Sequence, residues 1–345
     1  MAEKIHNKSL HKAKKSKMDE FYTQLSDIEK ELRHYKKHFK GKVVYCNCDD
    51  PRVSNFFHFF SYNFEKLGLK KLIATCYKSQ NMDLFSDNNS EQAIYLVYEG
   101  DKNGNNIPDA KEIGVNQLKG DGDFRSKESI ELLKQADIVV TNPPFSLFRE
   151  YVTQLMEYNK QFIIIGNKNA ITYKEIFRWI KENKMWVGNT PMSTDMLFDV
   201  PEDFAKELVA TKKQGSGYKI INGVVKGRAQ AVWFTNMDIA KRHEDLILYK
   251  TFNPNEYPRY DNYDAINVDK TKDIPFDYKD IMGVPITFLD KYNPEQFEIL
   301  GMSASAGYDE EIVGIPFLGE KDARPLINGQ NIYARIFIKN KRIWK

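Results

Sequence analysis

The sequence predicts an α/β protein with a mainly parallel sheet, helices on both faces of that sheet, and a loop-rich C-terminal region. Two observations predict this fold. Between residues 18 and 240, short apolar runs typical of buried strands alternate with amphipathic stretches at helical spacing. After about residue 240 the sequence becomes rich in Tyr, Asn, Asp and Pro, and few helices are recognisable.

The expected elements follow from the spacing of apolar residues along the chain. The expected helices are 18–39, 55–67, 126–135, 145–158 and 173–183. The expected strands are 42–48, 72–75, 93–100, 137–140 and 162–166, with further candidates at 186–189, 196–200 and 229–236. Ligands of such sheets bind beyond the carboxyl ends of the strands, so functional residues are sought there.

Three regions are expected in the chain. Residues 1–18 predict a flexible basic arm, residues 19–240 the α/β domain, and residues 241–345 an accessory region. The length of 345 residues suits one large α/β domain with such an addition.

Basic residues gather in three clusters, although the net charge is only +3. The clusters are Lys4, Lys8, Lys12, Lys14, Lys15 and Lys17; Lys212, Lys213, Lys219, Lys226 and Arg228; and Arg335, Lys339, Lys341, Arg342 and Lys345. The stretch 208–237, which holds the second cluster, contains no Asp or Glu. Together the clusters suit contact with a phosphate backbone, whereas each one alone is better explained as a solvated arm, loop or tail.

The three cysteines predict neither a disulfide framework nor a zinc site. Cys46 and Cys48 form a C-x-C pair without the second pair of ligands that structural zinc needs. Reduced thiols, a polar N-terminus and the lack of a long apolar run predict a cytoplasmic protein that needs no metal.

Residues 101–112 partly follow the spacing of a calcium-binding loop. Polar side chains occupy positions 1, 3, 5, 9 and 12 of its spacing, namely Asp101, Asn103, Asn105, Asp109 and Glu112. Asn106 replaces the glycine expected at position 6, and the Asn-Gly pair also signals a turn after a strand. The sequence alone therefore favours a turn.

The decisive segment is DIVVTNPPFSLF at 137–148. A buried strand ends in Asn142, Pro143, Pro144 and Phe145, and the two prolines fix two φ angles and remove two N–H donors. Asn142 is held extended because it precedes a proline. The turn is expected to present the Asn142 side-chain oxygen and the Pro143 carbonyl as acceptors beside an aromatic ring. That arrangement suits an exocyclic amino group, such as N6 of adenine; the alternative is an ordinary Pro-Pro turn.

On these residues the chain resembles the EcoRI-type adenine-specific DNA methyltransferases. The resemblance covers most of the chain. Its motifs are DEFYT at 19–23, YCNCDDP at 45–51, GDGDF at 120–124, NPPF at 142–145, WFTN at 233–236, MGVPITFLDKYNPEQFEILG at 282–301 and the closing NGQNIYARIFIKNK. It implies a Rossmann-like fold that uses S-adenosyl-L-methionine, with 19–240 as the catalytic domain and 241–345 as the target-recognition region.

The resemblance also implies roles for individual residues. Asn142, Pro143, Pro144 and Phe145 would handle the target adenine. The implied cofactor-binding residues are Tyr22, Thr23, Asp49, Asp50, Pro51, Asp123 and Phe124. The chain departs from the usual pattern because the residues after its first strand contain no glycine, and a strand-end turn cap is the alternative for Asp49 and Asp50.

The expected activity is methylation of adenine N6 in double-stranded DNA, with the base flipped out of the duplex. Lys212, Lys213, Lys219, Lys226 and Arg228 are the expected DNA contacts, on what the sequence suggests is a mobile loop. A cognate restriction endonuclease would act on the same site without stable binding. The alternatives are methylation of RNA adenine or of protein glutamine, and a catalytically silent DNA-binding relative.

Overall fold

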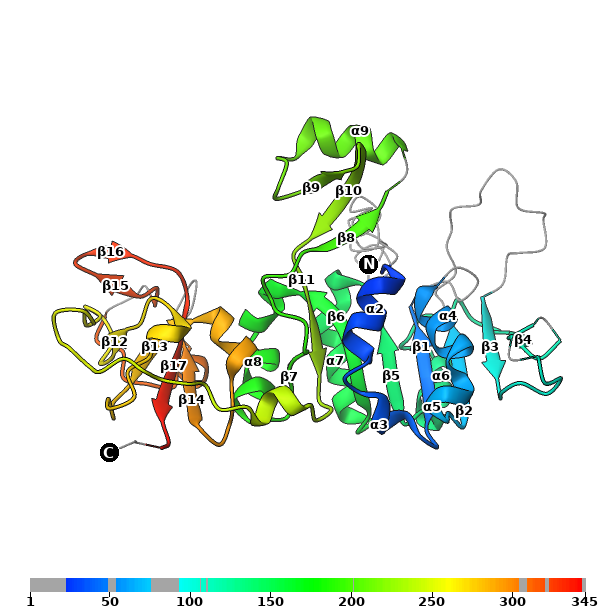
Figure 1. Ribbon diagram of the computed structural model, residues 1–345, viewed down its shortest axis with the longest axis horizontal. Coiled ribbons are helices and arrows are strands. Elements are labelled where there is room, and N and C mark those ends of the chain that lie inside the picture. Colours follow the sequence, from blue (N-terminus) through cyan, green and yellow to red (C-terminus); the bar gives the residue numbers. More distant parts are fainter. Residues whose placement is uncertain are drawn as a thin grey trace, which may run out of the picture. The chain divides into compact units, whose positions relative to one another are not determined.

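The structure, a computed structural model, describes residues 23–48, 54–75, 93–105, 107–109, 111–200, 202–303, 309–319 and 323–342 (Figure 1). These residues belong to two compact units. Unit 1 comprises Met1–Ala170 and Thr194–Met237, and unit 2 comprises Ile171–Ser193 and Asp238–Lys345. Residues 171–193 therefore group with the C-terminal part of the chain.

A mixed sheet forms the centre of unit 1 (Figure 1). Its strands are β1 (Val43–Asn47), β2 (Lys71–Thr75), β3 (Ile94–Tyr98), β4 (Gly114–Gln117), β5 (Ile138–Thr141), β6 (Gln161–Asn167) and β11 (Ala231–Thr235). They lie side by side in the order β4-β3-β2-β1-β5-β6-β11. The four central strands β2, β1, β5 and β6 are parallel, whereas β3, β4 and β11 run antiparallel to their neighbours.

The helices of unit 1 cover both faces of this sheet, since β1 and β5 are buried along their whole length. They are α2 (Leu25–Leu32), α3 (Lys36–Phe39), α4 (Asn55–Tyr62), α5 (Phe64–Leu67), α6 (Lys127–Gln135) and α7 (Phe148–Glu157), with 3-10 turns η1 (Phe145–Leu147) and η2 (Lys168–Thr172). The continuous helix expected at 55–67 is interrupted at Asn63. The Asn63 side chain donates to the Phe59 carbonyl at 2.8 Å and so competes with the helical ladder.

The order in which strands are added to the sheet reverses between β1 and β5. From β1 it passes through α4 and α5 to β2 on one side, and from β5 it passes through α7 to β6 on the other. β1 and β5 are direct neighbours, with Val44 beside Ile138 and Tyr45 beside Val139. In open α/β sheets, ligands bind at such a reversal, beyond the carboxyl ends of the strands.

Gly166 in β6 allows α7 to lie close to the sheet. A Cβ atom at this position would lie 2.4 Å from the Phe148 ring and 2.9 Å from the Phe234 ring. Phe148 opens α7, and its ring contacts that of Phe234 in β11 with centroids 5.1 Å apart. The missing side chain of Gly166 thus fixes the position of the segment that follows β5.

An insertion before β11 forms a small separate sheet in unit 1 (Figure 1). It contains β8 (Met196–Asp199), α9 (Glu202–Thr211), β9 (Tyr218–Ile221) and β10 (Val224–Ala229), with strand order β8-β10-β9. Asn222 and Gly223 both have positive φ, 50° and 79°, as a two-residue hairpin turn requires. The prediction of a loop is therefore wrong for residues 218–229, which form a β-hairpin.

Unit 2 contains a four-stranded sheet, although the sequence predicted a loop-rich region here. Its strands follow the order β12 (Ile266–Asn267), β13 (Met282–Pro285), β17 (Arg335–Asn340) and β14 (Phe297–Met302). The other elements are α8 (Lys174–Lys181), β7 (Trp186–Val187), α10 (Glu310–Val313), β15 (Leu326–Ile327), β16 (Gln330–Asn331), and the 3-10 turns η3 (Ala240–His243), η4 (Thr271–Asp273) and η5 (Ile286–Lys291).

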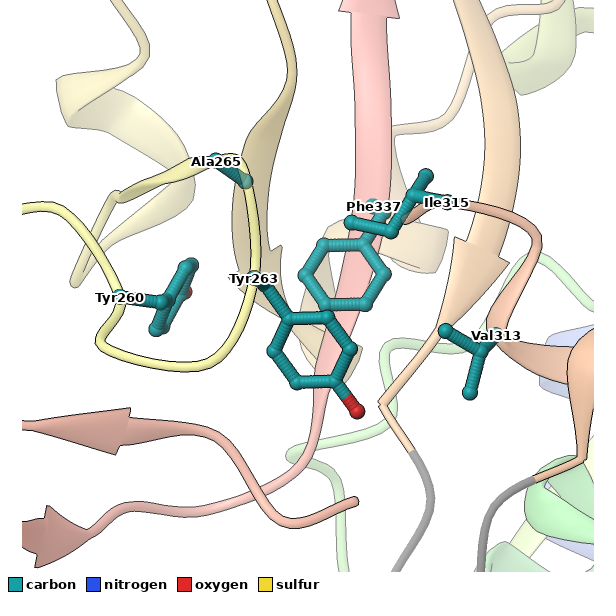
Figure 2. Close-up of a cluster of buried hydrophobic side chains, with 6 residues drawn as sticks. All are labelled: Tyr260, Tyr263, Ala265, Val313, Ile315 and Phe337. Atoms are coloured by element: carbon teal, nitrogen blue, oxygen red, sulfur yellow. The ribbon is translucent and has the colours of Figure 1, made fainter. Parts of the chain in front are cut away.

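Aromatic residues hold the loops of unit 2 on its sheet. Figure 2 shows the cluster of Tyr260, Tyr263, Ala265, Val313, Ile315 and Phe337. The Tyr263 ring lies 4.8 Å from that of Phe337 in β17, and the Tyr260 hydroxyl donates to Asn267 at 2.9 Å. The Tyr-rich composition of this region therefore supplies its core. Within the described ranges, no helix is long and apolar enough to cross a membrane.

Candidate active site

The turn Asn142–Phe145 follows β5 directly, at the reversal point of the central sheet. Asn142 is 7% exposed and Pro143 is buried, whereas Pro144 and Phe145 are half-buried. The Pro144 carbonyl accepts from the Leu147 N–H at 3.0 Å, which closes the 3-10 turn η1. The predicted rigid corner is thus present, with its amide inward and its aromatic ring partly accessible.

A buried hydroxyl lies immediately before this corner. Thr141, the last residue of β5, has an Oγ1 atom that is buried and has no hydrogen-bond partner among the residues that the structure describes. Such an atom is costly to bury unless a ligand supplies the missing partner.

The neighbouring strand β1 ends in Asn47, which is bound by α7. The Tyr151 hydroxyl donates to the Asn47 side-chain oxygen, and both residues are buried. The Tyr151 ring also meets the Phe124 ring edge-on, with centroids 5.0 Å apart. Burial, and then the nearby Cys48 and Tyr45, raises the pKa of the Tyr151 hydroxyl, which therefore stays protonated as the donor.

Thr23 lies at the same edge of the sheet. Its carbonyl accepts from the Asn55 side chain at 2.7 Å, and Asn55 opens α4, the helix that follows β1. The Thr23 side chain is 2% exposed, and its Oγ1 atom lacks a hydrogen-bond partner within the described part of the chain. Segments far apart in sequence, represented by Thr23, Phe124 and Asn142, therefore meet around the ends of β1 and β5.

Cys48 takes the backbone conformation that glycine usually supplies after β1. Its φ is 88°, and its N–H donates to the Thr75 carbonyl at 3.1 Å. Positive φ is strained for a residue with a Cβ atom, at a cost of order 1–3 kcal/mol. The glycine-free sequence noted above thus bends sharply at this position without a glycine.

Asp123 lies in the loop before α6, where Gly122 has φ 78°. The Asp123 carboxylate accepts from the Arg125 guanidinium at 2.7 and 3.0 Å, and Arg125 also binds Glu150 on α7 at 3.0 Å. Burial opposes ionisation of Asp123, but the hydrogen bonds from Arg125 outweigh it and hold the pKa of this carboxyl below its usual value. Asp123 is therefore an anion that can still accept at its free lone pairs.

Four of the residues expected to bind the cofactor lie outside the described residues: Tyr22, Asp49, Asp50 and Pro51. The described residues that flank them, Thr23 and Cys48, both lie at the carboxyl edge of the sheet. The basic cluster between Lys4 and Lys17 also falls outside the description.

Acidic residues from β8 and the turn before it pair with part of the second basic cluster. Lys219 and Arg228 both bind Asp195, and Lys226 binds Asp199. Asp195 and Asp199 precede the acid-free stretch in sequence, but antiparallel pairing places β8 beside β10. A sequence window cannot detect this neutralisation. Lys212 and Lys213, at the end of α9, are exposed, and no ion pair joins either of them to another described residue.

The insertion lies beside the site rather than at the far end of the sheet. Asp199 at the end of β8 binds Lys226 and also the side chain of Gln24, the neighbour of Thr23. The hydrogen bond from Lys226 is the main reason that the pKa of the Asp199 carboxyl is lowered. Burial opposes this shift, and the hydrogen bond from Gln24 adds to it. The tip of the hairpin carries exposed apolar side chains: Ile220, Ile221 and Val224 are 46%, 43% and 55% exposed.

Both arginines of the third basic cluster are engaged within unit 2. Arg335 is 8% exposed and binds Asn267 at 3.1 Å, and Arg342 binds Asp245 at 3.0 Å and Glu295 at 3.1 Å. These two arginines stabilise the unit, which weakens the case for phosphate contacts by Arg335 and Arg342. Across the described ranges, no group of three His, Cys, Asp or Glu side chains is placed to hold a metal ion.

The sequence did not predict a role for Asn47 and Tyr151, which join the end of β1 to α7. Asn47 gave a visible signal, since it is a polar residue at the end of an apolar run. Tyr151 gave none, because its bond to Asn47 spans 104 positions and depends on the packing of α7. Thr75, the last residue of β2, is likewise engaged, since its hydroxyl is bonded at 2.8 Å to the Tyr45 hydroxyl.

Comparisons with known proteins agree with this geometry. The family model described as "Adenine-specific methyltransferase EcoRI" matches residues 9–341. The chain is 51% identical to the "Type II methyltransferase M.EcoRI" of Escherichia coli over 347 residues, covering 100% of both chains. It is 40% identical to the "Type II methyltransferase M.MgeORF184P" of Mycoplasma genitalium, with 96% of this chain and 99% of that protein covered.

A third relative is the "Type II methyltransferase M.MpnI" of Mycoplasma pneumoniae, which is 38% identical over 96% of this chain and 98% of its own. No solved structure gives a significant match. The family model spans nearly the whole chain, and the relatives are matched over nearly their full lengths. This chain therefore belongs to the EcoRI family of adenine-specific methyltransferases.

Proposed function

We propose that the chain transfers a methyl group from S-adenosyl-L-methionine to the N6 amino group of an adenine that is flipped out of double-stranded DNA. The observation that carries the proposal is the rigid turn Asn142–Phe145, located at the reversal point of the sheet, in a chain of the EcoRI adenine-specific family. The parallel centre β2-β1-β5-β6 supports a Rossmann-like fold for the catalytic domain.

The residues around the ends of β1 and β5 fit this cofactor. The buried, unpartnered hydroxyl of Thr23 suits a polar group of its amino-acid part, and the Asp123 carboxylate suits the amino group of its adenine. Phe124, held by Tyr151, supplies an apolar wall. Tyr22, Asp49, Asp50 and Pro51 complete the proposed binding set. When bound, S-adenosyl-L-methionine supplies an electrophilic methyl group on a sulfonium.

The turn after β5 orients the amino group that attacks this methyl. The lone pair of adenine N6 is delocalised into the ring, so the free amine is a poor nucleophile. Acceptance of its two hydrogens by the Asn142 side-chain oxygen and the Pro143 carbonyl favours a pyramidal nitrogen with a localised lone pair. Pro144 and η1 hold these acceptors rigidly, and the half-buried Phe145 ring is available to stack on the base.

The insertion is the proposed DNA-contacting element of unit 1. Lys212 and Lys213 are exposed cations that no described ion pair neutralises, so they are the strongest candidates for phosphate contacts. Lys219, Lys226 and Arg228 would have to exchange their bonds to Asp195 and Asp199 for bonds to phosphate. The exposed apolar tip of the hairpin supports a contact surface here.

The remaining assignments rest on the family and on the sequence. Residues 1–18 would act as a basic arm, residues 19–240 as the catalytic domain, and residues 241–345 as the region that recognises the target sequence. Because the relatives are named Type II methyltransferases, the proposed context is a restriction–modification system. A cognate nuclease would share the DNA site without stable binding, and the work on DNA would take place in the cytoplasm.

Transfer of a labelled methyl group separates the proposal from its alternatives. The protein is incubated with labelled S-adenosyl-L-methionine and with duplex DNA, RNA or a protein extract, and the modified product is digested and identified. The proposal expects N6-methyladenine in duplex DNA. Labelled RNA adenine or protein glutamine as the main product would contradict it, as would a well-folded protein that labels none of them.

A further inference from the structure

The connection between β3 and β4 forms a second polar site, away from the ends of β1 and β5. Side chains at its start fold their oxygens back over its backbone. Asp101 Oδ1 accepts from Asn103 N at 3.1 Å and Gly104 N at 2.7 Å, and Asn105 Oδ1 accepts from Ile107 N at 2.7 Å. Gly104, with φ 81°, supplies the sharp bend that this folding requires.

Glu112, near the C-terminal end of this connection, binds the backbone at its start. Its Oε1 atom accepts from Lys102 N at 2.7 Å and Asn103 N at 3.1 Å, so the carboxylate lies over the first residues of the loop. Glu112 is only 8% exposed, and its Oε2 atom is buried without a hydrogen-bond partner among the residues that the structure describes. Both oxygens belong to one carboxylate, so the unpartnered oxygen lies close to the backbone of Lys102 and Asn103 that binds Oε1. An anionic oxygen buried in this way requires a cation or a donor.

We infer that residues 101–112 bind a calcium ion. The inferred ligands are the side-chain oxygens of Asp101, Asn103 and Asn105, the Ile107 carbonyl, and both oxygens of Glu112, with Asp109 acting through a water molecule. This set reproduces positions 1, 3, 5, 7, 9 and 12 of a twelve-residue calcium loop. Only Asp101 and Glu112 would bind through carboxylates directly, and the other direct ligands would be neutral oxygens.

The electrostatics of the neighbourhood favour a cation. Burial first, and then the charges of Glu112, Asp101, Glu65 and Asp109, raise the pKa of the Tyr98 hydroxyl to about 12. Asn103 and Asn105 are exposed, so an ion has access from solvent. Oxygen ligands in a flexible loop suit Ca²⁺ better than Mg²⁺, which demands a rigid octahedron.

Two substitutions in the sequence set the expected strength of binding. Asn replaces Asp at loop positions 3 and 5, which lowers the charge of the ligand set, so a dissociation constant on the order of 10⁻⁴ to 10⁻³ M is expected. Asn106 replaces the glycine of position 6 in the sequence. The inferred role is structural: the ion would fix the connection between β3 and β4, and methyl transfer would not require it.

Isothermal titration calorimetry of the full chain with calcium chloride tests the inference. The chain, stripped of metal with a chelator, should bind one calcium ion with an affinity in this range and should bind magnesium more weakly. Glu112→Gln should weaken calcium binding at least ~10-fold, since even an outer-sphere partner commonly contributes that much. Asp101→Asn provides a second variant if Glu112→Gln fails to fold, and Glu131→Gln, an exposed acid on α6, is the matched control.

Thermal unfolding gives an independent readout. Calcium at about ten times its dissociation constant should raise the melting temperature of the wild type and of Glu131→Gln, relative to sodium chloride of equal ionic strength, but not that of Glu112→Gln. No saturable calcium binding by the wild type would overturn the inference. Equal binding by a folded Glu112→Gln or Asp101→Asn would overturn it too, as would a preference for magnesium.

Discussion

The Tyr151 hydroxyl of α7 donates a hydrogen bond to the Asn47 side chain at the carboxyl end of β1. This bond connects the helix that follows the proposed catalytic turn with the strand that opens the proposed cofactor site. Because the Tyr151 ring also supports Phe124, one residue holds the loop 120–124, the end of β1 and α7 in register.

Tyr151→Phe should keep the ring and lose this bond. The Asn47 oxygen would then be buried without its donor, so the free energy of unfolding should fall by about 1–3 kcal/mol. The dissociation constant for S-adenosyl-L-methionine should rise, because the end of β1 is no longer held. Chemical denaturation and cofactor titration measure the two effects, with Tyr62→Phe, whose side chain is 62% exposed, as control. A variant that matches wild type in both would refute the positioning role.

Gly166→Ala tests whether the position of α7 depends on a missing side chain. The new methyl group would lie 2.4 Å from the Phe148 ring, so the start of α7 must shift, at a cost of roughly 1–3 kcal/mol. Methyl transfer should fall as well, since the proposed catalytic turn leads into Phe148. Gly114→Ala is the control, because its nearest neighbour would lie at an ordinary 3.6 Å. Equal stability of the two variants would show that α7 is not held in this way.

Cys48 offers a test of backbone strain beside the proposed cofactor site. Replacement of Ala by Gly usually destabilises a protein by about 0.5–1 kcal/mol. At φ 88° the order should reverse, and Cys48→Gly should be more stable than Cys48→Ala by about 1 kcal/mol. Both variants lose the thiol, so the difference between their unfolding free energies isolates the strain. If Cys48→Ala proves the more stable, then the backbone here is not strained.

Lys212 and Lys213 are expected to contribute to DNA binding. The double variant Lys212→Glu/Lys213→Glu should bind duplex DNA more weakly, and its affinity should depend less steeply on salt, by ~0.9 in the logarithmic slope for each lost phosphate contact. Lys66→Glu, an exposed residue on α5, is the control. Fluorescence anisotropy over a range of salt concentrations measures both quantities. An unchanged slope would exclude these lysines from the interface.

The sequence predicted the central strands well because each is a short apolar run between polar residues. β1, β2, β5 and β6 lie within a residue of their expected bounds, and the corner after β5 follows from two prolines that any fold must accommodate. The antiparallel strands β9 and β10 escaped prediction, whereas β3, β8 and β11 lie within expected strands. The hairpin 218–229 was expected as a loop because its exposed strands, with Ile220 and Val224 facing solvent, lack a clear alternation.

Long-range pairing explains the other differences. Lys219 and Arg228 lie in a stretch without acids, yet both meet Asp195 once β8 pairs with β10. The C-terminal sheet was not foreseen because its strands are short and separated by long loops, and its core comes from tyrosines such as Tyr260 and Tyr263. These contacts depend on the register between distant segments, which local spacing does not reveal.

Asn142→Ala tests whether the corner after β5 holds the adenine amino group. Single-turnover transfer of a labelled methyl group to duplex DNA should fall by at least ~100-fold, as expected when an oriented polar group is removed from the reacting atom. DNA affinity and thermal stability should stay close to those of wild type and of Asn116→Ala, a half-buried asparagine on the edge strand β4. If a folded Asn142→Ala variant transfers methyl groups at the wild-type rate, then Asn142 does not hold the adenine amino group.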